Sequence, residues 1–162
     1  MSRAQITEVA PAQPAPPSPS VPSPVPPVPE VLPESFTGSG QGWVALVGGG
    51  PGSNDLITAR GLELLGQADV VVVDALAPRG LLKDLHPDTE VIDASKRRGE
   101  HVMSQAQIDA LLVDLARRGK GVVRLKGGDP YVLGRGGEEA VACQRAGVAV
   151  EVVPGITSAV SV

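Results

Sequence analysis

Several residue types that would point to a particular class of protein are scarce in this sequence. A single cysteine, Cys143, cannot form an internal disulfide, and no second ligand stands near it in metal-binding spacing. Aromatic residues make up only 2% of the chain, so the core must be built from valine, leucine, isoleucine and alanine. No apolar run approaches the roughly 20 residues that a membrane-spanning helix needs, and the first residues lack the apolar segment of a signal peptide. We therefore expect a cytoplasmic protein.

The chain also lacks an excess of positive charge. Fourteen basic residues stand against eighteen acidic ones, which gives a net charge of −4 at pH 7. A general nucleic-acid-binding protein gathers positive charge, because its affinity comes from neutralising phosphates. The charge balance therefore argues against nucleic acid as the partner.

Proline is concentrated at one end of the sequence. Residues 1–40 contain eleven of the sixteen prolines. Proline removes amide donors and favours an extended polyproline conformation, and this stretch has too little apolar surface to offset the entropy lost on ordering. We expect residues 1–40 to be a disordered tail; a ligand for a proline-recognition domain is the alternative.

The rest of the chain alternates predicted strands and helices. Short apolar runs between glycine, proline and polar residues predict strands at 43–47, 69–73, 89–92, 122–125 and 148–153. Helices are expected at about 58–66, 78–84, 104–118 and 137–146. Such alternation is typical of parallel sheets with right-handed crossovers. The sequence therefore predicts one α/β lobe, over residues 41–155, with a five-stranded, mainly parallel sheet.

Two of the expected helices carry specific signals. In the longest, Ser104 and Gln107 fit a capping box, and apolar residues recur at i, i+3, i+4 and i+7. In the helix that begins near Thr58, Leu62 and Leu65 are expected to share the buried face. The lone cysteine is expected in the core.

The stretch from Val122 to Glu139 is the most informative in the chain. A buried strand runs into Gly127-Gly128-Asp129-Pro130, and a helix opens soon after, with acidic residues in its first turn. Open α/β sheets place ligands outside the carboxyl ends of their strands. The stretch therefore indicates a ligand-binding edge, although Asp129 also suits an Asx turn, and Glu138 and Glu139 suit a helix start better than catalysis.

The loops after the first two strands are candidates for the same edge. Gly48 and Gly50 resemble the start of a dinucleotide-binding turn, but Ser53 stands where the third glycine belongs, and Pro51 removes an amide. The nucleotide-binding interpretation is therefore weak. Asp74, at the end of the second strand, is either a helix cap or a functional carboxylate.

The motifs in this central stretch resemble those of a known family. Lys126-Gly127-Gly128-Asp129-Pro130 followed by Gly134-Arg135-Gly136-Gly137-Glu138-Glu139 is similar to the signature of uroporphyrinogen-III C-methyltransferases. These enzymes belong to the tetrapyrrole methylase family and use S-adenosylmethionine. The resemblance extends from about Trp43 to Ala159, which is nearly all of the chain expected to fold.

The resemblance implies a fold, a reaction and a partner. It implies the N-terminal lobe of a two-lobed enzyme, with residues 156–162 starting a second lobe and the cofactor lying between the lobes. The implied reaction is methylation of uroporphyrinogen III to precorrin-2, on the route to sirohaem and corrinoids, without a metal. The full-length protein is expected to be a homodimer, and the present chain to have weak activity.

The resemblance also implies roles for individual residues. The implied catalytic residues are Asp74, as proton acceptor, and Lys96, as proton donor. The implied cofactor-binding residues are Pro51, Gly127, Gly128, Asp129, Val132, Thr157 and Ser158. The substrate's carboxylates are expected to be bound by Arg97, Arg98, His101, Arg124, Lys126 and Arg135.

Two features leave alternatives open. The charged run from Lys96 to His101 is either a solvated surface loop or a patch for a polyanion such as a tetrapyrrole with eight carboxylates. Around Asp74 the family usually has Tyr-Asp-Arg-Leu, and this chain has Ala75 in place of the arginine, which bears on local substrate contact. Methylation of another corrin precursor and a non-catalytic nucleotide- or partner-binding module are the alternative functions.

Overall fold

The structure is a computed structural model that describes residues 41–95 and 103–160. The predicted proline-rich tail at 1–40 lies outside the described residues. Four predicted site residues also lie outside them: Lys96, Arg97, Arg98 and His101.

Within the described ranges, one parallel sheet of five strands forms the centre of the fold. The strands are β1 (Trp43–Gly48), β2 (Val70–Val73), β3 (Glu90–Asp93), β4 (Gly121–Lys126) and β5 (Ala149–Val153). Their order across the sheet is β3-β2-β4-β1-β5, and every neighbouring pair is parallel. The predicted α/β fold with a five-stranded sheet is confirmed.

The connections between the strands carry the helices. Among the described residues they are α1 (Ala59–Gln67), α2 (Gln105–Arg117) and α3 (Gly136–Arg145), with 3₁₀ helices η2 (Asn54–Leu56), η3 (Arg79–Asp84) and η4 (Ser158–Val160). The helix expected at 78–84 is thus a 3₁₀ helix that follows Pro78. In this part of the chain, no helix has the length and apolar character that crossing a bilayer requires.

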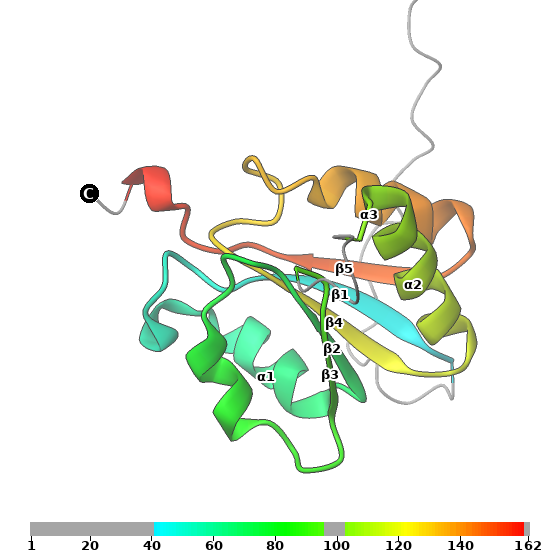
Figure 1. The fold of residues 1–162 in the computed structure, drawn as a ribbon, viewed down its shortest axis with the longest axis horizontal. Coiled ribbons are helices and arrows are strands. Elements are labelled where there is room, and N and C mark those ends of the chain that lie inside the picture. The colour runs from blue at the N-terminus through cyan, green and yellow to red at the C-terminus, as the bar shows by residue number, and fades with distance from the viewer. Residues whose placement is uncertain (1–40, 96–102, 161–162) are drawn as a thin grey trace, which may run out of the picture. The chain divides into compact units, whose positions relative to one another are not determined.

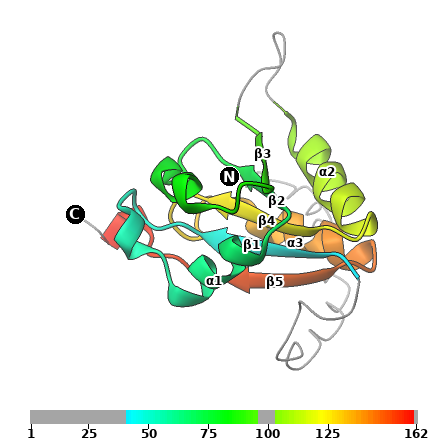
Figure 2. The same cartoon turned by 90° about the horizontal axis from the view of Figure 1, so that it is seen from below.

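The helices cover the two faces of the sheet as separate layers. α1 and η3 pack on one face, and α2 and α3 on the other (Figures 1 and 2). Alternation along β4 shows why: Val123 and Leu125 belong to the apolar cluster under α1, whereas Val122 and Arg124 face the opposite layer. Both faces of β1, β2 and β4 are therefore buried, as expected for the central strands of a parallel sheet.

The helix signals in the sequence were mostly right. The Ser104 side chain accepts a hydrogen bond from the Gln107 amide, and the Gln107 side chain accepts one from the Ser104 amide, so the capping box is confirmed. The predicted face of α1 is partly wrong, because Leu62 is 54% exposed while Leu64 and Leu65 are buried. Three apolar residues lie close together at 62, 64 and 65, and the sheet selects the pair that points toward Val47 and Val71.

Candidate functional site

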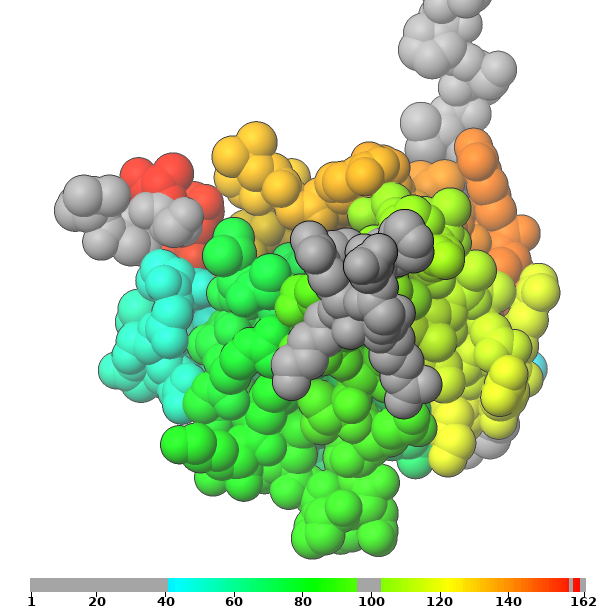
Figure 3. Space-filling model, viewed as in Figure 1, coloured from blue at the N-terminus to red at the C-terminus, as the bar shows by residue number. Residues whose placement is uncertain are grey.

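The candidate residues gather at the carboxyl edge of the sheet. Because all five strands are parallel, the segments that follow β1, β2, β4 and β5 emerge at the same edge (left in Figure 1). In Figure 3 the segments after β1, β4 and β5, in cyan, gold and red, are seen along this side of the surface. The edge thus brings together predicted site residues that are far apart in sequence.

Glycine backbones meet directly at this edge. The Gly50 amide donates to the Gly128 carbonyl oxygen at 3.2 Å, and the Gly128 amide donates to the Gly50 carbonyl oxygen at 2.8 Å. A Cβ at Gly48 would lie 2.6 Å from the Gly128 carbonyl oxygen, and a Cβ at Gly155 would lie 2.2 Å from the same atom. Side chains at these positions would force the loops apart, so the close approach requires glycine.

Asp129 ties two of these loops together. Its Oδ1 accepts a hydrogen bond from the Tyr131 amide at 2.8 Å, which is the Asx turn that the sequence allowed. Its Oδ2 accepts a hydrogen bond from the Gly155 amide at 3.1 Å, across 26 residues of sequence. Both carboxylate oxygens therefore fix backbone, and the Asx-turn alternative for Asp129 is confirmed.

Asp74 lies at the same edge, directly after β2. Its amide donates to the Leu125 carbonyl oxygen at 2.9 Å, which continues the parallel ladder between β2 and β4. The Asp74 side chain is 35% exposed, and its Oδ1 lies 3.5 Å from Arg124 Nη2. One side of the carboxylate therefore faces a buried cation, and part of it is open to solvent.

Arg124 and Lys126 form a buried ionic cluster with Glu139. Arg124 Nε donates to Glu139 Oε1 at 3.1 Å, and Lys126 Nζ lies 3.2 and 3.1 Å from the two Glu139 oxygens. Gln105 Nε2 adds a bond to Glu139 Oε1 at 3.3 Å. Glu139 is fully buried and the two cations are each 2% exposed. The structure therefore turns Arg124 and Lys126 inward, away from the surface patch expected for substrate carboxylates.

The sequence reasoning placed Glu139 at a helix start and missed its place in this cluster. The structure confirms its position in the first turn of α3. A further signal was present, because Gly136, Glu139, Ala140 and Cys143 recur at i, i+3, i+4 and i+7 and define the buried face of α3. A carboxylate on that face requires a buried partner.

Arg135 remains at the surface. It is the N-cap residue before α3, with a positive φ of 56°, and its guanidinium binds the Glu138 carboxylate through Nε at 2.8 Å and Nη2 at 2.6 Å. The hydrogen bonds to Glu138 raise the pKa of Arg135, and those to Arg135 lower the pKa of Glu138. Among the described cations of the predicted substrate patch, Arg135 is the one with an exposed charge.

The other predicted cofactor-binding residues follow the same strands. Pro51 lies between Gly50 and Gly52 in the loop after β1, and both glycines have positive φ. Val132 is 48% exposed in the loop after β4. Thr157 lies after β5, and Ser158 begins η4. All are therefore placed at the carboxyl edge or in the segments leaving it.

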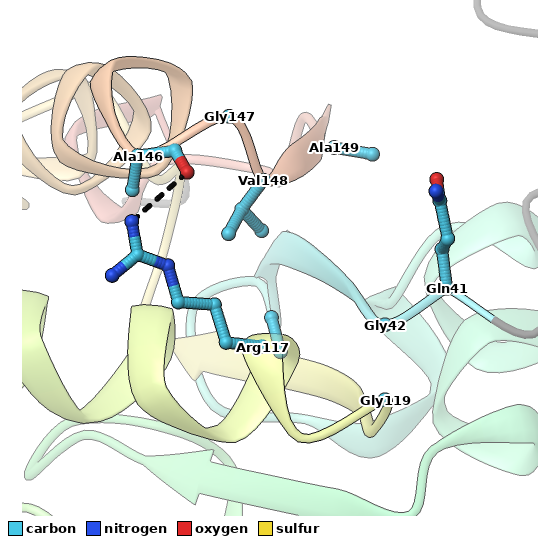
Figure 4. A pocket seen from close by; sticks show the side chains of 9 residues that line it. Gln41, Gly42, Arg117, Gly119, Ala146, Gly147, Val148 and Ala149 are labelled. Carbon is cyan, nitrogen blue, oxygen red and sulfur yellow. Dashed lines mark hydrogen bonds between the residues drawn. The ribbon is translucent and has the colours of Figure 1, made fainter.

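A cavity of about 300 Å³ lies at the opposite, amino edge of the sheet. Gln41 and Gly42, before β1, line it together with residues from the ends of α2 and α3, and Arg117 donates across it to the Ala146 carbonyl oxygen at 3.2 Å (Figure 4). None of the predicted site residues within the described ranges lines this cavity. It is therefore separate from the candidate site.

Residues 44–162 match the family model described as tetrapyrrole (corrin/porphyrin) methylases. This match covers well over half of the chain. The chain therefore belongs to the tetrapyrrole methylase family, as its glycine-rich motifs indicated.

Relatives of known name support the same placement. The chain is 50% identical over 121 residues to a uroporphyrinogen-III C-methyltransferase of Methanocaldococcus jannaschii, covering 75% of this chain and 50% of that protein. It is 56% identical over 118 residues to a siroheme synthase of Sodalis glossinidius, covering 73% of this chain and 25% of that protein. The chain thus spans about a quarter to a half of the length of these relatives.

Solved structures share the fold. A uroporphyrin-III C-methyltransferase from Thermus thermophilus, complexed with S-adenosyl homocysteine, matches with a TM-score of 0.62 and 46% identity, over 72% of this chain and 49% of that chain. A cobalamin biosynthetic enzyme, cobalt precorrin-4 methyltransferase, matches with a TM-score of 0.64 and 38% identity, over 76% of this chain and 50% of that chain. Similarity of fold therefore extends across methyltransferases whose names give different substrates.

Proposed function

We propose that this chain supplies one lobe of an S-adenosylmethionine-dependent uroporphyrinogen-III C-methyltransferase, which forms precorrin-2 in the cytoplasm. The observation that carries the proposal is the glycine-lined carboxyl edge, where the loops after β1, β4 and β5 meet beside Asp74. Membership of the family and 50% identity to the archaeal enzyme support it. The matched stretch covers 50% of the M. jannaschii relative and 25% of the Sodalis glossinidius relative, and we propose that a second lobe and a homodimer complete the active protein.

The carboxyl edge fits S-adenosylmethionine in two respects. The backbone contact between Gly50 and Gly128 leaves the edge free of intervening side chains, so a ligand can approach the main chain. The exposed apolar side chains of Val132 and Ile156 flank the same loops and suit the uncharged parts of the cofactor. Asp129 would act by holding the loops after β4 and β5 in register.

In the proposed reaction, S-adenosylmethionine supplies an electrophilic methyl group bound to a sulfonium. The residues of this chain would align the pyrrole carbon of the substrate with that methyl group and exclude water, which are the main sources of rate. Transfer of the methyl group would form a carbon–carbon bond, break the carbon–sulfur bond with release of neutral S-adenosylhomocysteine, and leave the macrocycle with one proton to lose. Asp74 would accept that proton with the exposed part of its carboxylate, and Lys96 would serve as the acid.

Recognition of the macrocycle would depend on cations at this edge. Arg135 is exposed and could bind a substrate carboxylate through two parallel hydrogen bonds if it exchanged its partner Glu138. The predicted contribution of Arg97, Arg98 and His101 remains part of the proposal. Arg124 and Lys126 could contact substrate only by leaving Glu139.

The proposal is tested by restoring the length of the relatives. A chimera joins residues 1–162 to the unmatched half of the M. jannaschii enzyme, and its product from uroporphyrinogen III is followed by mass and fluorescence. We expect S-adenosylmethionine-dependent methylation by the chimera, and weak or no turnover by the 162-residue chain alone. A chimera that folds and binds S-adenosylhomocysteine but methylates nothing would exclude this function.

Asp74→Ala in the same chimera tests the assignment of the base. General-base catalysis contributes about 10²- to 10⁴-fold, so we expect turnover to fall by about that factor while the affinity for S-adenosylhomocysteine is kept. Unchanged turnover would remove Asp74 from the mechanism.

Cobalt-precorrin-4 is the substrate class of the second candidate function. The fold match to that methyltransferase is as good as the match to the uroporphyrin enzyme, although the identity is lower. Offering both tetrapyrroles to the chimera separates the two functions.

A further inference from the structure

We infer that Arg124 is a positioning residue: its guanidinium, anchored on Glu139, holds the carboxylate of Asp74 at the carboxyl edge. The inference rests first on a count of charges. The cluster contains two buried cations, Arg124 and Lys126, but a single fully buried carboxylate, Glu139. Asp74 provides the second negative charge, so that the four side chains are neutral together.

The geometry of Arg124 divides its donors among three partners. Nε donates to Glu139 Oε1 at 3.1 Å, Nη1 donates to the Val72 carbonyl oxygen at 3.4 Å, and Nη2 donates to Asp74 Oδ1 at 3.5 Å. The guanidinium is rigid and planar, so fixing two of its donors orients the third. Contacts to α3 and to the backbone of β2 therefore aim Nη2 at the side chain of Asp74.

Because Lys126 also binds Glu139, the effect of Arg124 on Asp74 can be tested without leaving Glu139 unpaired. Its ammonium contacts both oxygens of Glu139, and Gln105 donates to one of them. Without Arg124, Glu139 would still have one cation and one amide donor. Neutralising Glu139 therefore does not require Arg124, and the second cation is the one that reaches Asp74.

The catalytic role of Arg124 rests on the proposed function, in which Asp74 is the proton acceptor. A proton acceptor must be held within hydrogen-bond reach of the proton that it takes, and a misplacement of about 1 Å can cost about 10²-fold in rate. Arg124 does not touch the reacting atoms in this account. It acts through Asp74, and it is itself buried, with 2% exposure, beneath the partly exposed carboxylate.

Arg124→Met tests the inference, and Arg60→Met is the matched control. Arg60 also binds a glutamate, in its case through two bonds, with Nε and Nη2 each 2.8 Å from Glu151, but it lies on the α1 side of the sheet. The first readout uses the 162-residue chain with ¹³C-labelled aspartate, and the Asp74 carboxyl resonance is assigned by its loss in Asp74→Asn. We expect Arg124→Met to shift that resonance and Arg60→Met to leave it in place.

Turnover in the chimera is the second readout. We expect Arg124→Met to lower kcat by about 10- to 100-fold, with KM for the tetrapyrrole and affinity for S-adenosylhomocysteine nearly unchanged, and Arg60→Met to keep kcat. An unshifted resonance in Arg124→Met, or a fall in kcat equal to that in Arg60→Met, would overturn the inference. A rise in KM with kcat unchanged would overturn it in favour of direct substrate binding. If Arg124→Met shifts the resonance in the 162-residue chain but the unmutated chimera shows no turnover, the proposed function is rejected and the positioning of Asp74 by Arg124 is still supported.

Discussion

The carboxyl and amino edges of the sheet differ in the groups that pack against them. At the carboxyl edge, backbone meets backbone between Gly50 and Gly128, and a buried ionic cluster lies beneath Asp74. At the amino edge, a cavity of about 300 Å³ lies between the ends of α2 and α3, and a surface arginine spans it. Among the described residues, this cavity therefore lies at one edge, and the candidate site residues lie at the other.

The two edges also differ in the helix ends that they receive. The helices run antiparallel to the strands, so their N-termini lie at the carboxyl edge and their C-termini at the amino edge. The positive ends of the helix dipoles thus favour anionic groups at the carboxyl edge. That edge also contains the buried charges of Arg124, Lys126 and Glu139, whose desolvation costs free energy.

Removing the buried carboxylate is expected to have the largest effect on stability. Glu139→Ala leaves Arg124 and Lys126 buried without their partner, and breaking such a cluster costs about 3–5 kcal/mol. Arg117→Ala, at the amino edge, removes an exposed hydrogen bond and should cost at most about 1 kcal/mol. Urea unfolding of both variants measures the difference. Equal costs would show that the two edges do not differ energetically.

A methyl group at the meeting point of the loops is expected to have the next largest effect. In Gly155→Ala the new Cβ would lie 2.2 Å from the Gly128 carbonyl oxygen, and overpacking of this kind costs about 1–3 kcal/mol. Gly66, in α1, has open space around its Cβ position, so Gly66→Ala should stabilise the protein by about 0.4–1 kcal/mol. The two changes should shift the unfolding midpoint in opposite directions. A stabilising Gly155→Ala would contradict the close approach.

The buried thiol of Cys143 is the neutral counterpart of Glu139 on α3, nearer the amino edge. Burial raises the pKa of Cys143 to about 11, whereas an unfolded cysteine has a pKa of about 8.5. The folded state keeps its proton longer, so this contribution to stability is complete below about pH 8.5 and is lost as pH rises toward about 11. At pH 10 the loss should be about 1–2 kcal/mol.

Comparison with Cys143→Ala isolates this contribution from other groups that titrate at high pH. The difference in free energy of unfolding between the two proteins should narrow between pH 8 and pH 10. A constant difference would mean that the thiolate is not penalised in the folded state.

Most of the fold could be predicted from the sequence because local signals agree with the tertiary structure. The four valines specify β2, and the capping box at Ser104 and the apolar periodicity together specify α2. The face of α1 could not be decided locally, since leucines at 62, 64 and 65 offered competing stripes and packing on β1 and β2 chose between them.

The candidate site was predictable in position but not in its contacts. The glycines and Asp74 follow strand ends, and a parallel sheet brings strand ends to one edge. The pairing of Arg124 with Glu139 depends on which face of β4 meets α3, which follows from the strand order rather than from either motif. Charged residues in a glycine-rich motif therefore suggested ligand contact, whereas the structure pairs two of them internally.

The most direct test of the carboxyl edge as the cofactor site is an NMR titration of the ¹⁵N-labelled chain with S-adenosylhomocysteine, which detects even weak binding by one lobe. The account predicts that the amide resonances of Gly50, Gly128 and Gly155 shift with ligand concentration, while those of Gly119 and Gly147 at the amino edge stay in place. Shifts confined to Gly119 and Gly147, or no shift at either edge at millimolar ligand, would contradict it.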